Sequence, residues 1–338
     1  MLNLTGNIFP LNIGIVIVGT IILAVVGAFF GLLYRGIDRK LSAHMQGRVG
    51  PPIIQPFRDV QKLLMKENII PDGAVSWLFT AAPFVCLIVS VVLLLYIPMF
   101  GQPAFLGSTG DAILILYLLI IPALALVAGG FASSSPYATV GAQREMVILM
   151  SYEFPLAMAI VALAWRIGHA TGANPFMLST IAEYPIWNLV GPMGIIGSLI
   201  LLFTLLVVTP GEVSKVPFDI AEAETEIAGG VLVEYSGRNL CLFYLADIIK
   251  AFAMSALIVA LFIPYNLSPI FGLSAAPAVV VDVVFFLIKV FAVMFFSIVL
   301  VRTAMARFKI SQASWIYIIA MTLIALVGLI LIWVDLVV

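Results

Sequence analysis

The sequence predicts an all-α membrane protein with eight transmembrane helices and both termini on the outer side. Of the 338 residues, 63% are hydrophobic and only 10% are charged, whereas about a quarter are charged in an ordinary soluble domain. Such a chain has too little polar surface to face water on all sides, so a soluble enzyme and a disordered linker are excluded. The formal net charge is −1, and this balance gives no indication of a nucleic-acid partner.

Eight apolar runs are long enough to cross a bilayer, which takes about 20 helical residues. They lie at approximately 11–34, 78–99, 111–131, 145–166, 191–210, 241–264, 277–300 and 314–335. The first run is too long for a signal-peptide core and has no cleavage site after it, so we expect it to remain as a helix. The runs are apolar on all faces, unlike the alternating strands of a membrane β-barrel. We therefore expect one membrane domain over 1–338, with sizeable loops at about 36–77 and 211–240.

Most of the 16 basic residues lie in alternate connections between these runs. By the positive-inside rule these connections are cytoplasmic, and an even number of spans then puts both termini outside a cell membrane. No cofactor or metal motif accompanies the spans. Cys86 and Cys241 lie in or beside apolar runs, and His44 and His169 lie on opposite sides of the membrane. We expect no catalytic residue, metal or cofactor in this chain.

The first cytoplasmic loop contains a short amphipathic stretch, from Phe57 to Glu67, after a Gly50-Pro51-Pro52 sequence that excludes a helix. Two interpretations are open: a helix that lies on the membrane surface with its lysines near lipid headgroups, or a docking face for a soluble partner. The candidate docking residues are Arg48, Arg58, Asp59, Lys62, Lys66 and Glu67.

The second cytoplasmic loop is acidic, unlike its neighbours. We expect a helix from Pro217 that ends at Gly229-Gly230, with Asp219, Glu222 and Glu226 on one face at i, i+3 and i+7. Like charges this close should raise at least one carboxyl pKa. The loop is either a solvated acidic face or a group of carboxylates that holds and passes protons.

Ionisable residues inside the spans are functional candidates, because each costs at least about 2.5–3.5 kcal/mol at the bilayer centre. Asp247 and Lys250 stand at i, i+3 and are expected to pair. Glu153 and Lys289 have no partner on their own helices, so we expect them to face other helices or a hydrated cavity. These residues fit a proton-handling subunit, an ion-coupled transporter, or an anchor whose charges are only structural.

Two loop motifs resemble one known family. Residues 212–237 contain E-x-x-K-x-P-F-D-I-A-E-A-E-T-E-I-A-G-G-x-x-x-E-Y-S-G, and 48–71 contain R-x-G-P-P, Q-P, D-x-x-K-L-L-x-K-E and I-I-P. Both resemble the cytoplasmic loops of the eight-helix membrane subunit beneath the peripheral arm of respiratory complex I, shared by energy-converting [NiFe] hydrogenases. The interval between Gly50-Pro51 and Gln55-Pro56 is short, and Arg58 stands where the quinone-reducing branch usually has alanine. Both departures resemble the membrane-bound hydrogenase and formate hydrogenlyase branch, and they put quinone binding in doubt.

The resemblance implies a membrane anchor and proton- or ion-coupling subunit of a ferredoxin-linked [NiFe] hydrogenase-type complex. The implied partners are a hydrogenase-like large subunit and an iron–sulfur small subunit, which carry the [NiFe] site and the clusters, together with antiporter-like and small membrane subunits and lipid. The implied coupling path comprises Asp219, Glu222, Glu224, Glu226, Glu234, Glu145, Glu153, Asp247, Lys250 and Lys289. The alternatives are the quinone-binding subunit of complex I, a hydrogenase relative whose catalytic partner lacks nickel, and an independent ion-coupled transporter.

Overall fold

The computed structural model describes residues 13–107, 111–172, 174, 176–272 and 276–337. In this part of the chain, eight helices are long and apolar enough to cross a membrane, which confirms the predicted all-α membrane fold and its number of spans. They are α1 (Ile13–Met45), α3 (Ser76–Tyr96), α4 (Ala112–Ala132), α5 (Pro136–Thr171), α7 (Pro192–Glu212), α9 (Gly237–Phe262), α10 (Ala276–Met294) continuing into α11 (Leu300–Ala304), and α12 (Ile310–Trp315) continuing into α13 (Thr322–Val337). A π-helical turn joins each of the last two pairs.

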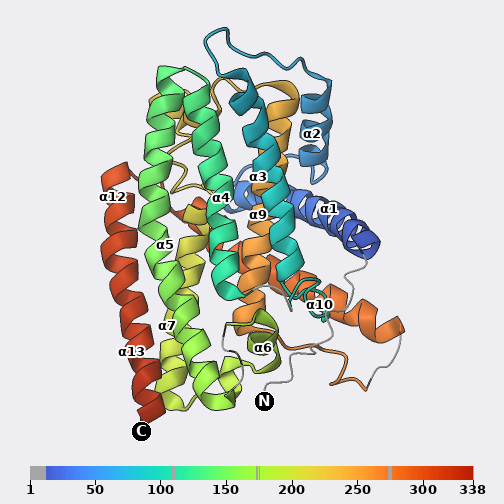
Figure 1. Ribbon diagram of the computed structural model, residues 1–338, viewed down its shortest axis with the longest axis vertical. Helices are drawn as coiled ribbons and strands as arrows, with labels where there is room; N and C mark the ends of the chain where they lie inside the picture. The colour runs from blue at the N-terminus through green and yellow to red at the C-terminus, as the bar shows by residue number, and fades with distance from the viewer. Residues whose placement is uncertain (1–12, 108–110, 173, 175, 273–275, 338) are drawn as a thin grey trace, which may run out of the picture.

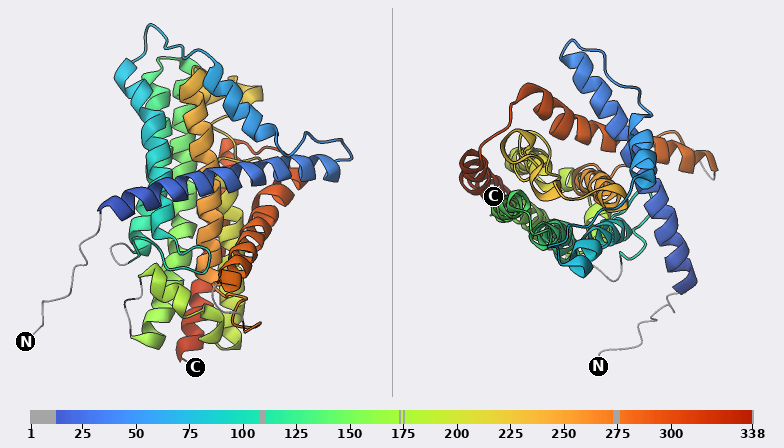
Figure 2. Two further views of the ribbon diagram at one scale, coloured as in Figure 1. Left: turned by 90° about the vertical axis from the view of Figure 1, so that its right-hand side faces the viewer. Right: turned by 90° about the horizontal axis from the view of Figure 1, so that it is seen from above.

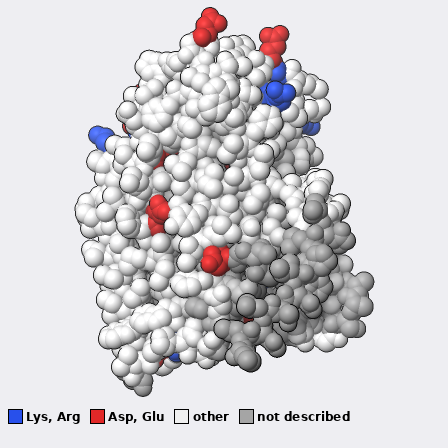
Figure 3. Space-filling view, viewed as in Figure 1, with Lys and Arg blue, Asp and Glu red and all other residues white. Residues whose placement is uncertain are grey.

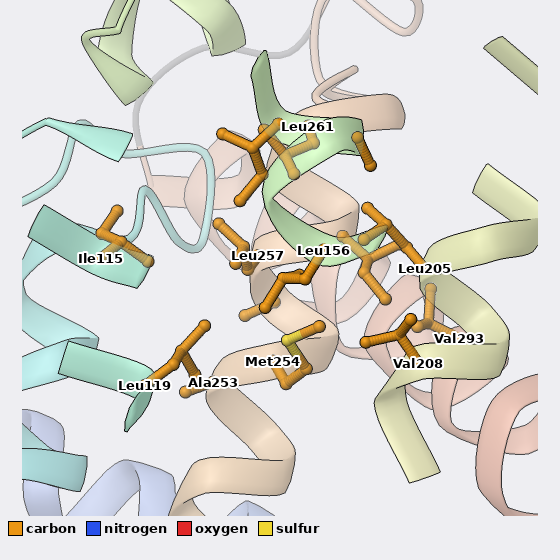
Figure 4. Packing of buried hydrophobic residues seen from close by; sticks show 14 of the residues in the cluster. Ile115, Leu119, Leu156, Leu205, Val208, Ala253, Met254, Leu257, Leu261 and Val293 are labelled. Carbon is orange, nitrogen blue, oxygen red and sulfur yellow. The ribbon is translucent and has the colours of Figure 1, made fainter. Parts of the chain in front are cut away.

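Helix α9 is the centre of the bundle and contacts α1, α3, α7 and α10. Its membrane-spanning window is 89% buried, because small alanines alternate with large apolar side chains along it and let neighbouring helices approach from several sides. Figure 4 shows side chains such as Leu119 of α4, Leu156 of α5 and Leu205 of α7 converging on Met254 and Leu257 of α9. Burial on every face explains why this helix is apolar all round.

The two ends of the bundle differ. One end, the loop face, carries α2 (Gln55–Met65) and residues 213–236; the opposite face carries α6 (Leu178–Glu183) and the end of α13 (Figure 1). Helix α1 crosses the bundle instead of running along it (Figure 2). Most of the surface seen in Figure 3 carries no charge, apart from side chains near the loop face and a few carboxylates at mid-height. An uncharged belt of this kind is what lipid chains require.

Helix α5 starts nine residues before the predicted span. Pro136 follows Ser135 and occupies the first turn, where proline's missing N–H costs nothing. Glu145 therefore lies more than two turns inside the helix, not at its mouth. The sequence prediction placed the boundary too late because the first turns of α5 carry the polar residues Gln143 and Arg144, which a hydropathy window counts against a span.

The helix predicted from Pro217 to Gly229 is wrong. Only α8 (Glu224–Ile227) is helical in this segment, so Asp219, Glu222 and Glu226 do not share a helix face. Phe218 is buried against the rings of Phe308 and Tyr317, and the contact favours an irregular path along the bundle over a free helix. The predicted end is in the right place, because Gly229 adopts a left-handed conformation (φ 97°).

The amphipathic helix of the first loop is confirmed as α2, two residues earlier than predicted. It begins beside Pro56, which is buried, and packs against α1 and α9. Phe57 lies against Phe29 of α1, with 5.7 Å between ring centroids. Arg58 and Lys62 face outward. The helix is thus fixed to the bundle by its apolar side and leaves its basic side open.

Candidate functional site

A cavity of about 220 Å³ opens at the loop face among α3, α4, α5, α7 and α9. Ionisable side chains line one part of it: Arg35, Glu145, Glu212, Lys215, Glu222, Tyr244, Asp247 and Lys250. Apolar side chains line the rest, including Leu63 of α2, Cys86 of α3 and Phe243 of α9. We name it the acidic cavity. A mixed lining of this kind, at depth within a membrane bundle, is typical of a functional site.

Asp247 and Lys250 of α9 do not pair with each other, so the predicted ion pair between them is wrong. Lys250 Nζ lies 2.8 Å from Glu212 Oε1 at the end of α7, and Lys215 pairs with Asp247. Tertiary packing explains the difference. Helix α7 and the second cytoplasmic loop (residues 213–236, the acidic loop) lie against α9 and offer partners with better geometry than the next turn of the same helix. The two cross-element pairs tie the loop to the bundle at the wall of the cavity.

Glu145 stands apart from these pairs. Its side chain is 4% exposed, and it accepts a hydrogen bond of 3.4 Å from Ser214 Oγ. Among the ion pairs of the described residues, none includes Glu145. A carboxyl in such surroundings is suited to hold and release a proton, because it is buried and the nearby charge of Lys250 acts on it without a direct ion pair.

Glu222 lies in the loop, outside the membrane-spanning helices. Burial raises its pKa to about 7; Lys215 lowers it, and the charges of Asp247 and Glu145 raise it further. Burial and the positive charge of Arg35 lower the pKa of Lys215. A loop carboxyl with a raised pKa is therefore present, as predicted, but the main cause is burial, and the like charges that contribute are Asp247 and Glu145 instead of the neighbouring loop carboxylates. A carboxyl with this pKa exchanges protons near neutral pH.

A second, more polar cavity of about 320 Å³ adjoins the first. Arg35, Ser214, Lys215 and Glu222 line both cavities. The second is completed by Val216, Asp219, Glu224, Arg302 and Arg307. We name it the polar mouth. Because Glu222 and Lys215 stand on the shared wall, they lie between the loop surface and the buried carboxylates.

Three other loop carboxylates have different surroundings. Asp219 accepts two hydrogen bonds from Arg307, at 2.8 and 2.6 Å, and Glu226 pairs with Arg144 of α5 at 2.5 Å. These contacts hold the acidic loop to the bundle. Glu234 is half-buried and lines neither cavity. The structure therefore brings Glu222, and at the mouth Asp219 and Glu224, toward the acidic cavity, and leaves Glu226 and Glu234 outside it.

The two unpaired span residues lie in different places. Glu153 follows Glu145 by two turns of α5 and is half-buried, so it lies beside the acidic cavity without lining it. Lys289 is at the opposite face, where Nζ donates to the carbonyl oxygens of Ile263 and Tyr265, at 2.9 and 2.8 Å. Lys289 thus faces the end of α9 and not the helix of Glu153, and it lines a cavity other than the acidic cavity.

The candidate docking residues of the first cytoplasmic loop are exposed, with one exception. Arg48, Arg58, Lys62, Lys66 and Glu67 are exposed. Asp59 instead turns toward α1: burial raises its pKa, but hydrogen bonds from Arg39 (2.7 Å) and Gln55 (3.0 Å) bring it below its usual value. Large apolar side chains accompany the basic ones, including Val49 and Met65. Exposed apolar side chains among charged ones are typical of a protein interface.

Sequence reasoning missed Arg35, Glu212 and Lys215 as site residues. Glu212 and Lys215 both belong to the motif of the second cytoplasmic loop. The sequence did not show that Glu212, at the end of a helix, points into the cavity. Arg35 is the first charge after a long apolar run, and only the crossing of α1 over α9 shows that it reaches the cavity wall.

The fold and this cavity define a polytopic α-helical membrane subunit with ionisable groups open to one face. The chain belongs to the family described as NADH dehydrogenase, whose model matches residues 17–333. The H subunit of the NADH-quinone oxidoreductase of Geobacillus kaustophilus is 32% identical over 256 residues, 72% of each chain. Its counterpart in Brevibacillus brevis is 30% identical over 305 residues, 88% of this chain and 85% of the relative.

A solved structure is also similar over nearly the whole chain. It is a chain of the membrane-bound sulfane sulfur reductase, an archaeal respiratory membrane complex; the TM-score is 0.79 and the identity 27%, over 94% of this chain and 99% of that one. These similarities confirm the resemblance to the complex I and membrane-bound hydrogenase superfamily. The chain is a multi-pass protein of the cell membrane and a membrane subunit of an oxidoreductase complex.

Proposed function

We propose that this chain is the membrane anchor and proton- or ion-coupling subunit of a ferredoxin-linked, [NiFe] hydrogenase-type complex. The observation that carries the coupling role is the acidic cavity, where Glu145, Glu212 and Asp247 lie behind Glu222 on the wall of the polar mouth. The redox centres, a [NiFe] site or its nickel-free descendant with iron–sulfur clusters, belong to a large and a small soluble subunit on the loop face. Antiporter-like and small membrane subunits lie beside the bundle.

A physical sequence of events supports this function. An electron that arrives in the docked soluble subunit adds negative charge near the loop face. That charge favours the protonated form of Glu222, which already titrates near neutral pH. Protonation of Glu222 removes one of the two negative charges that stabilise the Lys215 ammonium, so its pair with Asp247 carries more of that stabilisation. The charge of Glu145 and Glu153 on α5 then changes in turn, and a neighbouring subunit senses the change.

The short connection between α1 and α2 supports the hydrogenase branch. A Cβ added at Gly36 of α1 would lie 2.1 Å from the carbonyl oxygen of Ile53, so residues 51–54 lie directly on α1. The connection is short and close to α1 here, and it lacks the longer segment that helps to frame a quinone chamber. The similarity to a sulfane sulfur reductase chain favours a nickel-free hydrogenase relative as the second candidate. The relatives from NADH-quinone oxidoreductases favour a quinone-binding subunit as the third.

The metal content of the native complex, purified through a tag on this chain, tests the branch. Nickel with an excess of iron would support the hydrogenase assignment, and hydrogen evolution from reduced ferredoxin should follow. Iron without nickel would contradict it and leave the other two candidates, which quinone reduction separates. A chain that migrates alone on a native gel would contradict all three and favour an independent transporter.

Ion translocation by the complex in vesicles tests the coupling role. Glu145→Gln, which removes the buried titratable group and keeps its shape, should lower ion uptake per electron transferred about tenfold or more. Electron transfer and subunit content should stay near wild type. Unchanged uptake in a fully assembled variant would exclude Glu145 from the path. Asp72→Asn, at an exposed position outside the candidate docking and coupling residues, is the matched control.

A further inference from the structure

A third cavity, of about 200 Å³, lies at the opposite face. Its walls come from the connection between α3 and α4, from α6, from the end of α9 and from α10. Figure 1 places α6 and the start of α10 at the end of the bundle away from α2. Apolar residues line the inner part (Val259, Ala260, Pro264, Phe286), and polar side chains join them (Gln102, Ser179, Glu183, Asn266).

Lys289 provides the buried charge of this cavity. Its side chain is 9% exposed, and its ammonium donates two hydrogen bonds to the carbonyl oxygens at the end of α9. An ammonium group has three donors, and among the described residues no carboxylate lies within 4.0 Å of it. The ring of Phe285, 4.8 Å from Nζ, adds weak stabilisation. Lys289 is therefore a buried cation with a donor to spare and no directly paired counter-ion.

Glu183 provides the opposite charge at the rim. It is the last residue of α6, is exposed, and lines the same cavity as Lys289 without forming an ion pair with it. The two charges are therefore both available to a bound molecule. A ligand that carries an anionic group and a cationic group would satisfy both charges at once.

This cavity is not a continuation of the acidic cavity. Along α9, Lys250 precedes Ile263 by 13 residues, which is about 20 Å of helix at 1.5 Å per residue. Residues 251–262 between them are buried in the apolar core, apart from Ser255, whose hydroxyl donates to the carbonyl oxygen of Ala251. The charges of the opposite face thus need an explanation of their own.

We propose that this cavity binds the headgroup of a zwitterionic phospholipid, with the phosphate against Lys289 and the headgroup ammonium against Glu183. The cavity lies where the membrane helices end, which is the depth of the headgroup layer. Its apolar inner wall suits the glycerol and the first methylenes of the chains. Phosphate oxygens accept charge-assisted hydrogen bonds from a lysine. Free phosphate shares that chemistry but not the cation, so the two sources can be distinguished.

The test counts phospholipids that stay bound to the purified complex in native mass spectrometry after mild delipidation with detergent. Lys289→Gln should lower the occupancy of the retained lipid about tenfold, since a charge-assisted hydrogen bond is lost. Lys309→Gln, which removes a cation near the loop face, is the matched control and should retain the lipid. Equal occupancy in the two variants would overturn the proposal.

Two further measurements identify the ligand. Glu183→Gln, reconstituted in mixed vesicles, should lose the wild-type preference for phosphatidylethanolamine over phosphatidylglycerol; a preference that persists would contradict the role of Glu183. Inorganic phosphate should fail to displace the lipid, and displacement at millimolar phosphate would indicate a free-anion site instead. Ala182→Phe fills the cavity but keeps both charges, and it should also lose the lipid. If Lys289→Gln does not assemble, retention in Ala182→Phe overturns the proposal by itself.

Discussion

Lys250 and Glu212 form a deeply buried ion pair in the bundle, with 2.8 Å between Nζ and Oε1 and exposures of 6% and 2%. Removing one partner leaves the other as an unpaired buried charge, which typically costs about 3–5 kcal/mol. We expect Lys250→Met to lower the melting temperature of the purified complex strongly. The double variant Lys250→Met/Glu212→Gln should recover part of the loss, because it removes both charges. A double variant as unstable as the single one would show that the pair does not act as a unit.

The pH dependence of stability should report on Glu222. Its pKa rises from 4.5 to about 7 on folding, so between these values the folded chain binds more protons than the unfolded one. Its contribution to stability therefore falls as pH rises through this window. Glu222→Gln should match wild type near pH 4.5 and exceed its unfolding free energy above pH 7 by roughly 1–3 kcal/mol. Melting curves across this range test the point, with Glu224→Gln as the exposed control. A difference that does not change with pH would contradict the assignment.

At the scale of elements, the position of the acidic loop depends on Gly141 of α5, which has no side chain and so lets the loop backbone pack directly against the helix. A Cβ added at Gly141 would lie 2.6 Å from the backbone nitrogen of Val231 and 2.8 Å from the carbonyl oxygen of Ala221. Both of these atoms belong to the loop backbone, which cannot move aside as the end of a flexible side chain could. Gly141→Ala should therefore displace the loop and cost about 1–3 kcal/mol.

Limited proteolysis measures that displacement, because a loosened loop is cut faster near residues 224–229. Gly14→Ala is the matched control, since a Cβ there meets nothing within 4 Å. It adds the same methyl group to a helix at a position without a close neighbour. Equal cleavage rates in the two variants would show that Gly141 does not position the loop.

Helix α2 allows a second prediction at this scale. Its apolar side is fixed to α1 and α9, and Lys62 is exposed on its open side. Lys62→Glu should lower the salt concentration at which the soluble arm dissociates and slow reassociation about tenfold, because charges at an interface rim mainly control the association rate. Lys62→Arg keeps the charge and is the control. An arm that stays bound at raised salt would exclude this surface as the docking site.

The sequence predicted the membrane-spanning helices well, but it predicted the contacts between side chains of different elements less well. Each span was predictable because a bilayer imposes a length and a composition on every helix that crosses it. The pairing of Asp247 and Lys250 was not, because spacing along one helix says nothing about the end of α7 or the loop that packs beside it. The helix predicted after Pro217 failed for the same reason: Phe218 and Ile220 are buried against the bundle, and that contact outweighs local propensity. The cavity depends on such contacts, so its lining could be predicted only in part.

At the scale of the whole molecule, the charge distribution predicts the orientation of the bundle. Arg58 and Lys62 are exposed on α2, which lies on the loop face, and Arg48 is exposed in the connection before α2. The positive-inside rule places that face in the cytoplasm. The coupling proposal depends on this orientation, because it requires the proposed soluble arm and its electron donor to be in the cytoplasm. The opposite face, with Glu183 and the end of α13, is then outside.

Cysteine labelling tests this orientation without altering the bundle. The native Cys86 and Cys241 are buried, so a membrane-impermeant maleimide should leave them unmodified. After the soluble arm is removed, Lys62→Cys should react in inside-out vesicles and Glu183→Cys in right-side-out vesicles. The reverse pattern would place the acidic cavity and its polar mouth on the outer side. Protons would then enter from the wrong compartment, so this single result would exclude the orientation and, with it, the proposed direction of coupling.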